Sequence, residues 1–93
     1  MTAVPEQVGT VSVQVRYFAG ARAAAGVPEE AVRLAAPVTV SDVLAAVLEL
    51  HDEGLAKVLP ACSFLLDGVA VRDRGTGVPA QATLDVLPPF AGG

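Results

Sequence analysis

Apolar and polar side chains alternate along residues 11–18, which predicts a β-strand with one buried face. The residues on the apolar face are Val11, Val13, Val15 and Tyr17. Shorter apolar runs predict further strands over residues 31–35, 62–66, 69–72 and 84–87. Asp67 and Gly68 separate two of these runs and favour a two-residue hairpin turn. Residues 19–26 are small and glycine-bounded, so we expect a connector with one helical turn.

A helix is predicted to begin at Thr39 and to end between His51 and Gly54. The Thr39 side chain can cap the first turn, and Asp42, three residues later, can complete a capping box. Gly54 suits the left-handed position that often ends a helix, and residues 55–59 can add a short turn. The apolar residues that follow the cap at helical spacing are Val40, Val43, Leu44, Val47 and Leu48.

This order of elements predicts an α+β fold with about five strands in one mixed sheet and one main helix packed on one face. A chain of 93 residues is long enough for one domain with a modest core. We expect a flexible leader over residues 1–10, a folded domain over residues 11–87 and an extended tail over residues 88–93.

Composition and charge narrow the classes of function. Hydrophobic residues make up 53% of the chain and charged residues 17%, which is too apolar for a disordered protein. The formal charge of −4 argues against nucleic acid as a partner, because phosphate binding needs a basic patch. No membrane span and no signal peptide are expected from the pattern of apolar residues. A single cysteine fits a reducing compartment, so we expect a cytoplasmic protein.

Two apolar residues break the alternation of their strands. Phe18 shares the face of Arg16, and Leu87 shares the face of Asp85, although these faces should meet solvent. Both residues end their strands, so a parallel pairing of the first and last strands would bring them together. Ala70 lies on the outward face of its own strand and could join them. The three residues predict either a docking surface or irregular strand ends, with Phe18 folded back onto the connector.

The residue types that usually carry catalysis or bind metals are scarce in this chain. One histidine, one cysteine and scattered acids give no metal-ligand spacing, so no metal site is expected. Cys62 opens a short strand and is interpreted as a small buried residue. His51 has no catalytic partner in the sequence. We therefore expect that the protein is not an enzyme by itself and that it acts with partner enzymes.

The C-terminal segment is suited to entering the active site of another protein. Its residues are Pro88, Pro89, Phe90, Ala91, Gly92 and Gly93. The prolines favour an extended path, the glycines keep the end narrow, and residues 89–93 reach roughly 17 Å when extended. A carboxylate at Gly93 is ionised and is a poor electrophile, so its use requires activation by an ATP-using partner. The alternative is a frayed end without a role.

Four parts of the chain together resemble the small subunit of molybdopterin synthase and its relatives, the ubiquitin-like sulfur carriers of β-grasp fold. They are residues 13–20, the helix start at Thr39, the hairpin at Asp67 and above all residues 87–93. The resemblance implies that a ubiquitin-activating-like enzyme adenylates the Gly93 carboxylate and that a sulfur donor then converts it to a thiocarboxylate. It implies no stably bound cofactor, because ATP is used by the activating partner.

The resemblance also implies an acceptor enzyme, such as the molybdopterin synthase large subunit in molybdenum cofactor biosynthesis, into which the tail inserts. It places Phe18, Ala70 and Leu87 at the family's partner surface. The same carrier chemistry could instead supply sulfur for cysteine, thiamine or a thio-containing secondary metabolite. A protein modifier joined through Gly93 to partner lysines, and a plain interaction domain, are further alternatives.

Overall fold

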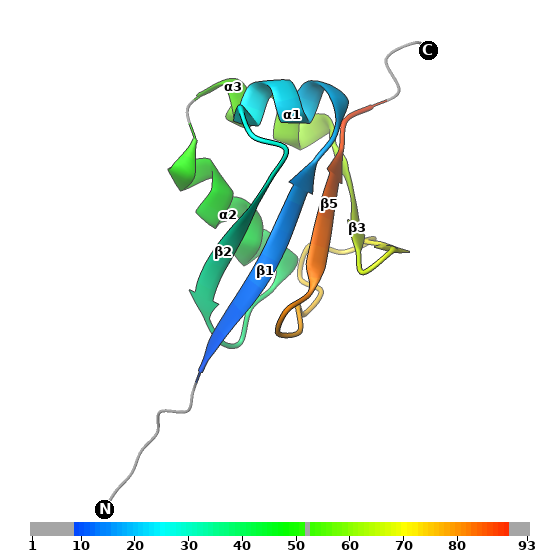
Figure 1. The fold of residues 1–93 in the computed structure, drawn as a ribbon. Coiled ribbons are helices and arrows are strands. Elements are labelled where there is room, and N and C mark those ends of the chain that lie inside the picture. The colour runs from blue at the N-terminus through cyan, green and yellow to red at the C-terminus, as the bar shows by residue number, and fades with distance from the viewer. Residues whose placement is uncertain (1–8, 52, 90–93) are drawn as a thin grey trace, which may run out of the picture.

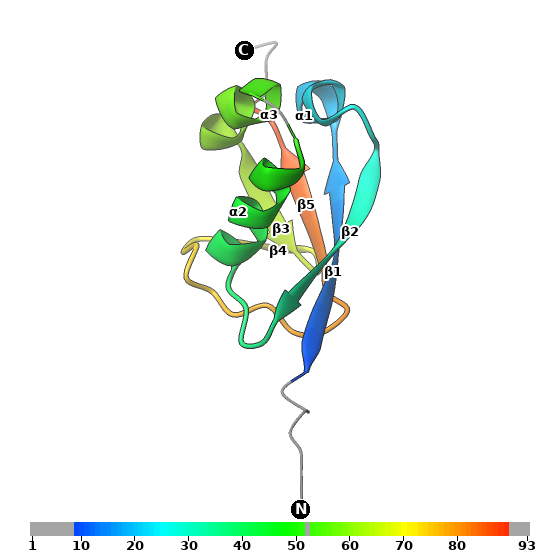
Figure 2. The ribbon, with the colours of Figure 1, turned by 90° about the vertical axis from the view of Figure 1, so that its left-hand side faces the viewer.

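The computed structural model describes residues 9–51 and 53–89, which form one sheet with α2 and α3 on one side (Figures 1 and 2). The strands are β1 (Thr10–Tyr17), β2 (Glu29–Ala35), β3 (Ser63–Leu66), β4 (Val69–Ala70) and β5 (Thr83–Leu87). The helices are α1 (Ala19–Ala25), α2 (Val40–Leu50), α3 (Glu53–Val58) and the short 3₁₀ helix η2 (Leu59–Ala61). Among the described residues, no helix has both the length and the apolar character needed to cross a membrane.

The strands lie in the order β2-β1-β5-β3-β4, so the first and last strands of the chain are neighbours inside the sheet. β1 and β5 run parallel, with Tyr17 opposite Val86. β2 pairs antiparallel with β1, while β3 pairs antiparallel with both β5 and β4. The predicted five-stranded mixed sheet and the parallel pairing of the first and last strands are therefore confirmed.

The hydrophobic core lies between this sheet and the helices. The largest fully buried side chains come from β1, β5, α2 and α3, and they are Val13, Val15, Leu84, Val86, Val40, Val43, Val47 and Leu55. Complete burial of one such side chain contributes about 1.5–3 kcal/mol. The predicted inward face of β1 is confirmed. The placement of Leu48 on the buried stripe of the helix is wrong, since this residue is 38% exposed.

Two local sequence signals form the structures expected of them. The Thr39 side chain accepts from the Asp42 N–H at 3.2 Å, and the Asp42 carboxylate accepts from the Thr39 N–H at 2.9 Å. This is the reciprocal capping box that starts α2. The hairpin between β3 and β4 turns through Asp67 and Gly68, whose φ angles of 49° and 84° are both left-handed. Backbone polar groups and side chains within a few residues determine both features.

The predicted connector is the first of two helical regions that differ from expectation. Residues 19–25 form the seven-residue helix α1 rather than a connector with one helical turn. Alanine has the highest helix propensity, and Ala21 and Ala25 are buried one turn apart, although no large apolar residue marks this face. Gly54 does not end α2, because the helix stops at Leu50 and Gly54 lies inside α3.

Six strand boundaries also differ from the predicted ones, four by one residue and two by two residues. β2 begins at Glu29 rather than at residue 31, because pairing with β1 extends to Arg16 opposite Glu29. β4 ends at Ala70, and Arg72 is outside it. β4 pairs only with β3, through Leu65–Ala70 and Leu66–Val69, and this pairing does not extend to Arg72.

Candidate functional site

Strand β5 leads from the interior of the sheet to the predicted tail. It pairs with β1 on one side and with β3 on the other, up to Leu87. The Phe18 N–H donates to the Val86 carbonyl at 3.2 Å, so hydrogen bonding between the β1 side and β5 continues to the end of β5. Pro88 is half-buried and Pro89 is exposed, so burial of the chain ends at this proline pair. The other predicted tail residues lie outside the described residues: Phe90, Ala91, Gly92 and Gly93.

α2 and α3 lie on one side of the sheet (Figure 2), and the strand register places the predicted docking residues on the other side. Phe18 is 38% exposed, and its backbone stays extended, with φ −122° and ψ 150°. It follows Tyr17, as Leu87 follows the paired Val86, so Phe18 and Leu87 lie level on adjacent strands. Ala70 is exposed on the edge strand β4. The structure therefore brings Phe18 and Leu87 together and places Ala70 on the same face, with β3 between.

An ion pair that the sequence analysis did not anticipate lies in the middle of this outer face. Arg16 donates twice to the Asp85 carboxylate, from Nε at 2.6 Å and from Nη2 at 3.0 Å. Asp85 is only 7% exposed, and its hydrogen bond and charge raise the pKa of Arg16. The same guanidinium lies 5.7 Å from the centre of the Phe18 ring. Opposite charges on matching faces of two adjacent strands were the available sequence signal.

The buried thiol of the chain does not have the environment of a nucleophile. Cys62 is buried, and its Sγ donates to the Val58 carbonyl at 3.3 Å. Burial raises the pKa of this thiol, while the charge of Arg74 opposes the shift, so the reactive thiolate is disfavoured. The interpretation of Cys62 as a small buried residue is confirmed. Over residues 9–51 and 53–89, no group of three or more His, Cys, Asp or Glu side chains is placed to hold a metal ion.

His51 has a partner that sequence spacing did not reveal. Its Nε2 lies 2.5 Å from Glu30 Oε2, and the Tyr17 hydroxyl donates to the same oxygen at 2.6 Å. Burial, followed by the hydrogen bond to Glu30, raises the pKa of Tyr17. The three residues join the end of β1, the start of β2 and the end of α2. They link two strands to the helix, on the side of the sheet opposite to the docking residues.

The strand order and the helices on one side of the sheet define the β-grasp fold of ubiquitin-like proteins. Pro88 and Pro89 follow directly on the interior strand β5 of this fold. Within that class, the chain belongs to the ThiS family, whose model matches residues 15–93. The match runs through the predicted docking residues and the terminal Gly92 and Gly93. The resemblance to ubiquitin-like sulfur carriers is thereby confirmed.

Solved structures of two kinds of protein are similar to this chain. SAMP1 from Haloferax volcanii, a small archaeal modifier protein, shares 27% identity with a TM-score of 0.79, over 88% of this chain and 99% of that one. The putative molybdopterin converting factor subunit 1 from Pyrococcus furiosus shares 25% identity with a TM-score of 0.77, over 86% and 99%.

A third similar chain comes from a complex of subunits 1 and 2 of the molybdopterin-converting factor from Helicobacter pylori. It shares 25% identity with a TM-score of 0.62, over 89% of this chain and all of that one (100%). No curated protein matches the chain. These similarities identify a ubiquitin-like sulfur carrier or modifier, a type of small protein that acts with partner enzymes.

Proposed function

We propose that this protein carries sulfur as a thiocarboxylate at Gly93 and serves as the small subunit of a cytoplasmic molybdopterin synthase. The observation that carries the proposal is the family match, which extends through the terminal Gly92 and Gly93. The fold supports it, because the interior strand β5 ends at Leu87 and is followed by a half-buried Pro88 and an exposed Pro89. In this proposal the folded domain docks on the partner enzymes, and the partner enzymes contribute the catalytic groups.

The chemistry begins at the Gly93 carboxylate. One carboxylate oxygen attacks the α-phosphorus of ATP in the active site of an activating enzyme, and pyrophosphate leaves. Hydrosulfide released by a sulfur donor then attacks the carbonyl carbon of the acyl-adenylate and displaces AMP, and loss of the thiol proton gives the thiocarboxylate. Two glycines and the absence of a β-carbon keep this end narrow enough for the channels of both enzymes. ATP is thus consumed by the partner, and this chain holds no cofactor of its own.

The acceptor that we propose is a large subunit of the molybdopterin-converting type. The similarity to a chain of the Helicobacter pylori complex of subunits 1 and 2 of the molybdopterin-converting factor supports this choice. The uncovered face of the sheet offers Phe18 and Leu87 beside the exit of the tail, with the Arg16–Asp85 pair between the strands that carry them. Docking on this face would hold the domain outside the acceptor while the tail enters it.

Intact-mass measurement tests the carrier chemistry directly. The full chain is incubated with ATP, its cognate activating enzyme and a sulfur source. We expect a product in which one oxygen has been replaced by sulfur, and we expect the conversion to require ATP. A chain whose mass is unchanged with every cognate activating enzyme would contradict the proposal.

The similarity to SAMP1 favours a second candidate function, conjugation of Gly93 to lysines of other proteins. The same activated carboxylate would then react with an amine and form an isopeptide bond. Conjugates of higher mass that survive treatment with reductant and contain a Gly93–lysine linkage would identify this activity. If they form without thiocarboxylate, the modifier function replaces the carrier function.

Substitution of Phe18 by aspartate tests whether the uncovered face of the sheet, called the docking face below, binds the large subunit. Phe18→Asp places a carboxylate on the apolar part of the face, close to the buried Asp85, and we expect the affinity for the cognate large subunit to fall about tenfold or more. The affinity is measured by titration calorimetry.

Leu48→Asp is the matched control for this substitution. Leu48 has the same exposed fraction of 38% but lies on α2, away from the docking face. Equal losses for both variants would indicate a general effect of charge or stability. An unchanged affinity of Phe18→Asp would eliminate the docking face.

A further inference from the structure

Strand β2 forms one edge of the sheet and pairs only with β1 in the described chain. The Tyr17 N–H donates to the Pro28 carbonyl at 2.8 Å, and the Ala36 N–H donates to the Gly9 carbonyl at 3.3 Å. In this register the backbone groups of even-numbered β2 residues point to β1. The residues whose backbone N–H and C=O groups point to the free side are therefore Glu29, Ala31, Arg33 and Ala35. This edge offers a row of hydrogen-bonding groups to another strand.

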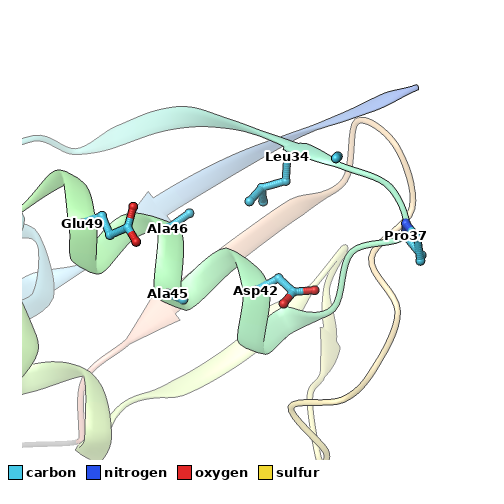
Figure 3. A pocket seen from close by; sticks show the side chains of 7 residues that line it. Leu34, Pro37, Asp42, Ala45, Ala46 and Glu49 are labelled. Atoms are coloured by element: carbon cyan, nitrogen blue, oxygen red, sulfur yellow. The ribbon is translucent and has the colours of Figure 1, made fainter. Parts of the chain in front are cut away.

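A groove runs beside this free edge, between β2 and α2 (Figure 3). It consists of two hollows of about 390 and 380 Å³ that share Leu34, Ala46 and Glu49. Leu34 is half-buried and extends from β2 towards the helix (Figure 3), which gives the groove an apolar floor. Ala45 and Ala46 have short side chains, so they leave space on the side of the groove that α2 forms. The groove therefore has room for side chains from a segment that pairs with the edge of β2.

The helix wall of the first hollow is acidic at both ends. Asp42 and Glu49 belong to the same face of α2 as Ala45 and Ala46, and both carboxylates line the groove (Figure 3). They are seven positions apart, which corresponds to about 10 Å along the helix axis. Glu49 is exposed, and Asp42 is exposed in the capping box. Arg33 on β2 lines the second hollow but not the first, and in the strand it lies opposite Ser12, on the outward face of the sheet.

We propose that the groove binds an extended segment of another protein that adds to the edge of β2 as a sixth strand. Alternate side chains of such a segment face the groove. Asp42 and Glu49 would each face a basic side chain of the segment, and Leu34 would face an apolar side chain between them. The segment therefore carries a basic, an apolar and a basic residue at these alternate positions. The backbone pairing supplies affinity, and the two charge contacts with the central apolar contact supply specificity.

A second copy of this chain fits the edge less well than a basic segment does. Antiparallel pairing of two β2 strands would put two α2 helices side by side on the same face of a continuous sheet. Four carboxylates, from Asp42 and Glu49 of each copy, would then meet at the interface. Each chain also carries a formal charge of −4, which opposes self-association. The charge of the groove therefore selects a basic partner.

The groove and the candidate carrier site are on different parts of the fold. β1 lies between β2 and β5, and the docking residues occupy the opposite face of the sheet from α2. A segment bound at β2 leaves Phe18, Leu87 and the exit of the tail free. The groove thus allows a second protein to hold this chain while the tail is engaged, and it does not depend on the fate of Gly93.

An NMR titration with a defined peptide tests the groove. The probe is an acetylated and amidated heptapeptide of sequence Thr-Lys-Thr-Ile-Thr-Lys-Thr, in which the lysines and isoleucine share one face of a strand. It is added to the ¹⁵N-labelled full chain. We expect saturable shifts of the amide signals of Ala31 and Arg33 and of residues 45–49. Replacing the fifth residue by proline should remove the saturable shifts, because proline cannot donate to the ladder.

Substitutions in the protein separate the groove from general charge effects. Glu49→Lys reverses the charge of the groove wall, and we expect it to weaken binding of the peptide about tenfold or more. Glu53→Lys is the matched control, since Glu53 is an exposed acid at the start of α3 that does not line the groove, and its binding should match the wild type.

Three outcomes would overturn the proposal. They are the absence of saturable shifts, shifts that map to β4 or the docking face, and equal weakening by both lysine substitutions. Dissociation of a dimer upon dilution, with shifts of the same β2 amides, would instead assign the edge to a second copy. Thiocarboxylate formation measured on Glu49→Lys shows whether the carrier function is intact, so failure at the groove and failure of the proposed function are distinguishable.

Discussion

Deletion of Gly93 is expected to abolish thiocarboxylate formation and to leave the thermal unfolding transition unchanged. The reacting carboxylate would sit one residue short of the position that the activating enzyme presents to ATP. Stability should be unaffected, because the buried core of the described residues ends at Val86. Intact mass after incubation with ATP, activating enzyme and sulfur source gives the first result. Differential scanning calorimetry gives the second.

Gly93→Ala is the companion variant, because it keeps the length of the tail and adds a single β-carbon. We expect slower sulfur incorporation with the same final mass change, since the channel must admit a wider residue. If the Gly93 deletion accumulates thiocarboxylate at the wild-type rate, the position of the carboxylate is not important and the proposed role of Gly93 is wrong. A large drop in the melting temperature would instead assign the tail a structural role.

Leu84→Ala is expected to cause the largest loss of stability among simple truncations in β5. Leu84 has no exposed surface, and it lies opposite Val15 on β1 and Leu66 on β3. Truncation of a buried leucine costs about 2–5 kcal/mol. That is a large part of the roughly 5–15 kcal/mol that stabilises a domain of this size. Urea denaturation followed by circular dichroism measures the free energy of unfolding.

Leu50→Ala provides the comparison, because Leu50 is 59% exposed near the end of α2. We expect a change within about 0.5 kcal/mol, as for most surface positions. Equal destabilisation by the two leucine substitutions would contradict the description of β5 as the centre of the core. A selective loss in Leu84→Ala would show that the strand leading to the tail is also a principal source of stability.

The elements that could be predicted from sequence are those determined by periodicity or by nearby residues. The alternation of β1, the capping box of Thr39 and Asp42 and the Asp67–Gly68 turn all depend on spacings of three residues or fewer. Helix α1 was missed because its buried face consists of alanines, which give no hydrophobic contrast. The start of β2 depends on how far β1 extends, which is a property of the pairing and not of β2 alone.

Part of the candidate site was predictable because side chains alternate between the two faces of a strand. Parity along each strand placed Phe18 and Leu87 on the outward face, and the parallel pairing of β1 with β5 then brought them level. The bond between Arg16 and Asp85 joins residues 69 positions apart, so it depends on the register of that pairing. The partner of His51 is likewise Glu30, on a strand whose predicted start was two residues too late.

The position of β5 between β1 and β3 has a consequence for synthesis on the ribosome. A nascent chain that has not yet supplied residues 83–87 contains no partner for the inner edge of β1 or of β3. The sheet can close only when the strand nearest the C-terminus has been translated and released from the exit tunnel, because its contacts are the most distant in sequence. Truncated products therefore expose apolar surface and are open to proteolysis. A chain can therefore complete its fold only if it extends at least through β5, the strand that precedes the proposed reactive segment.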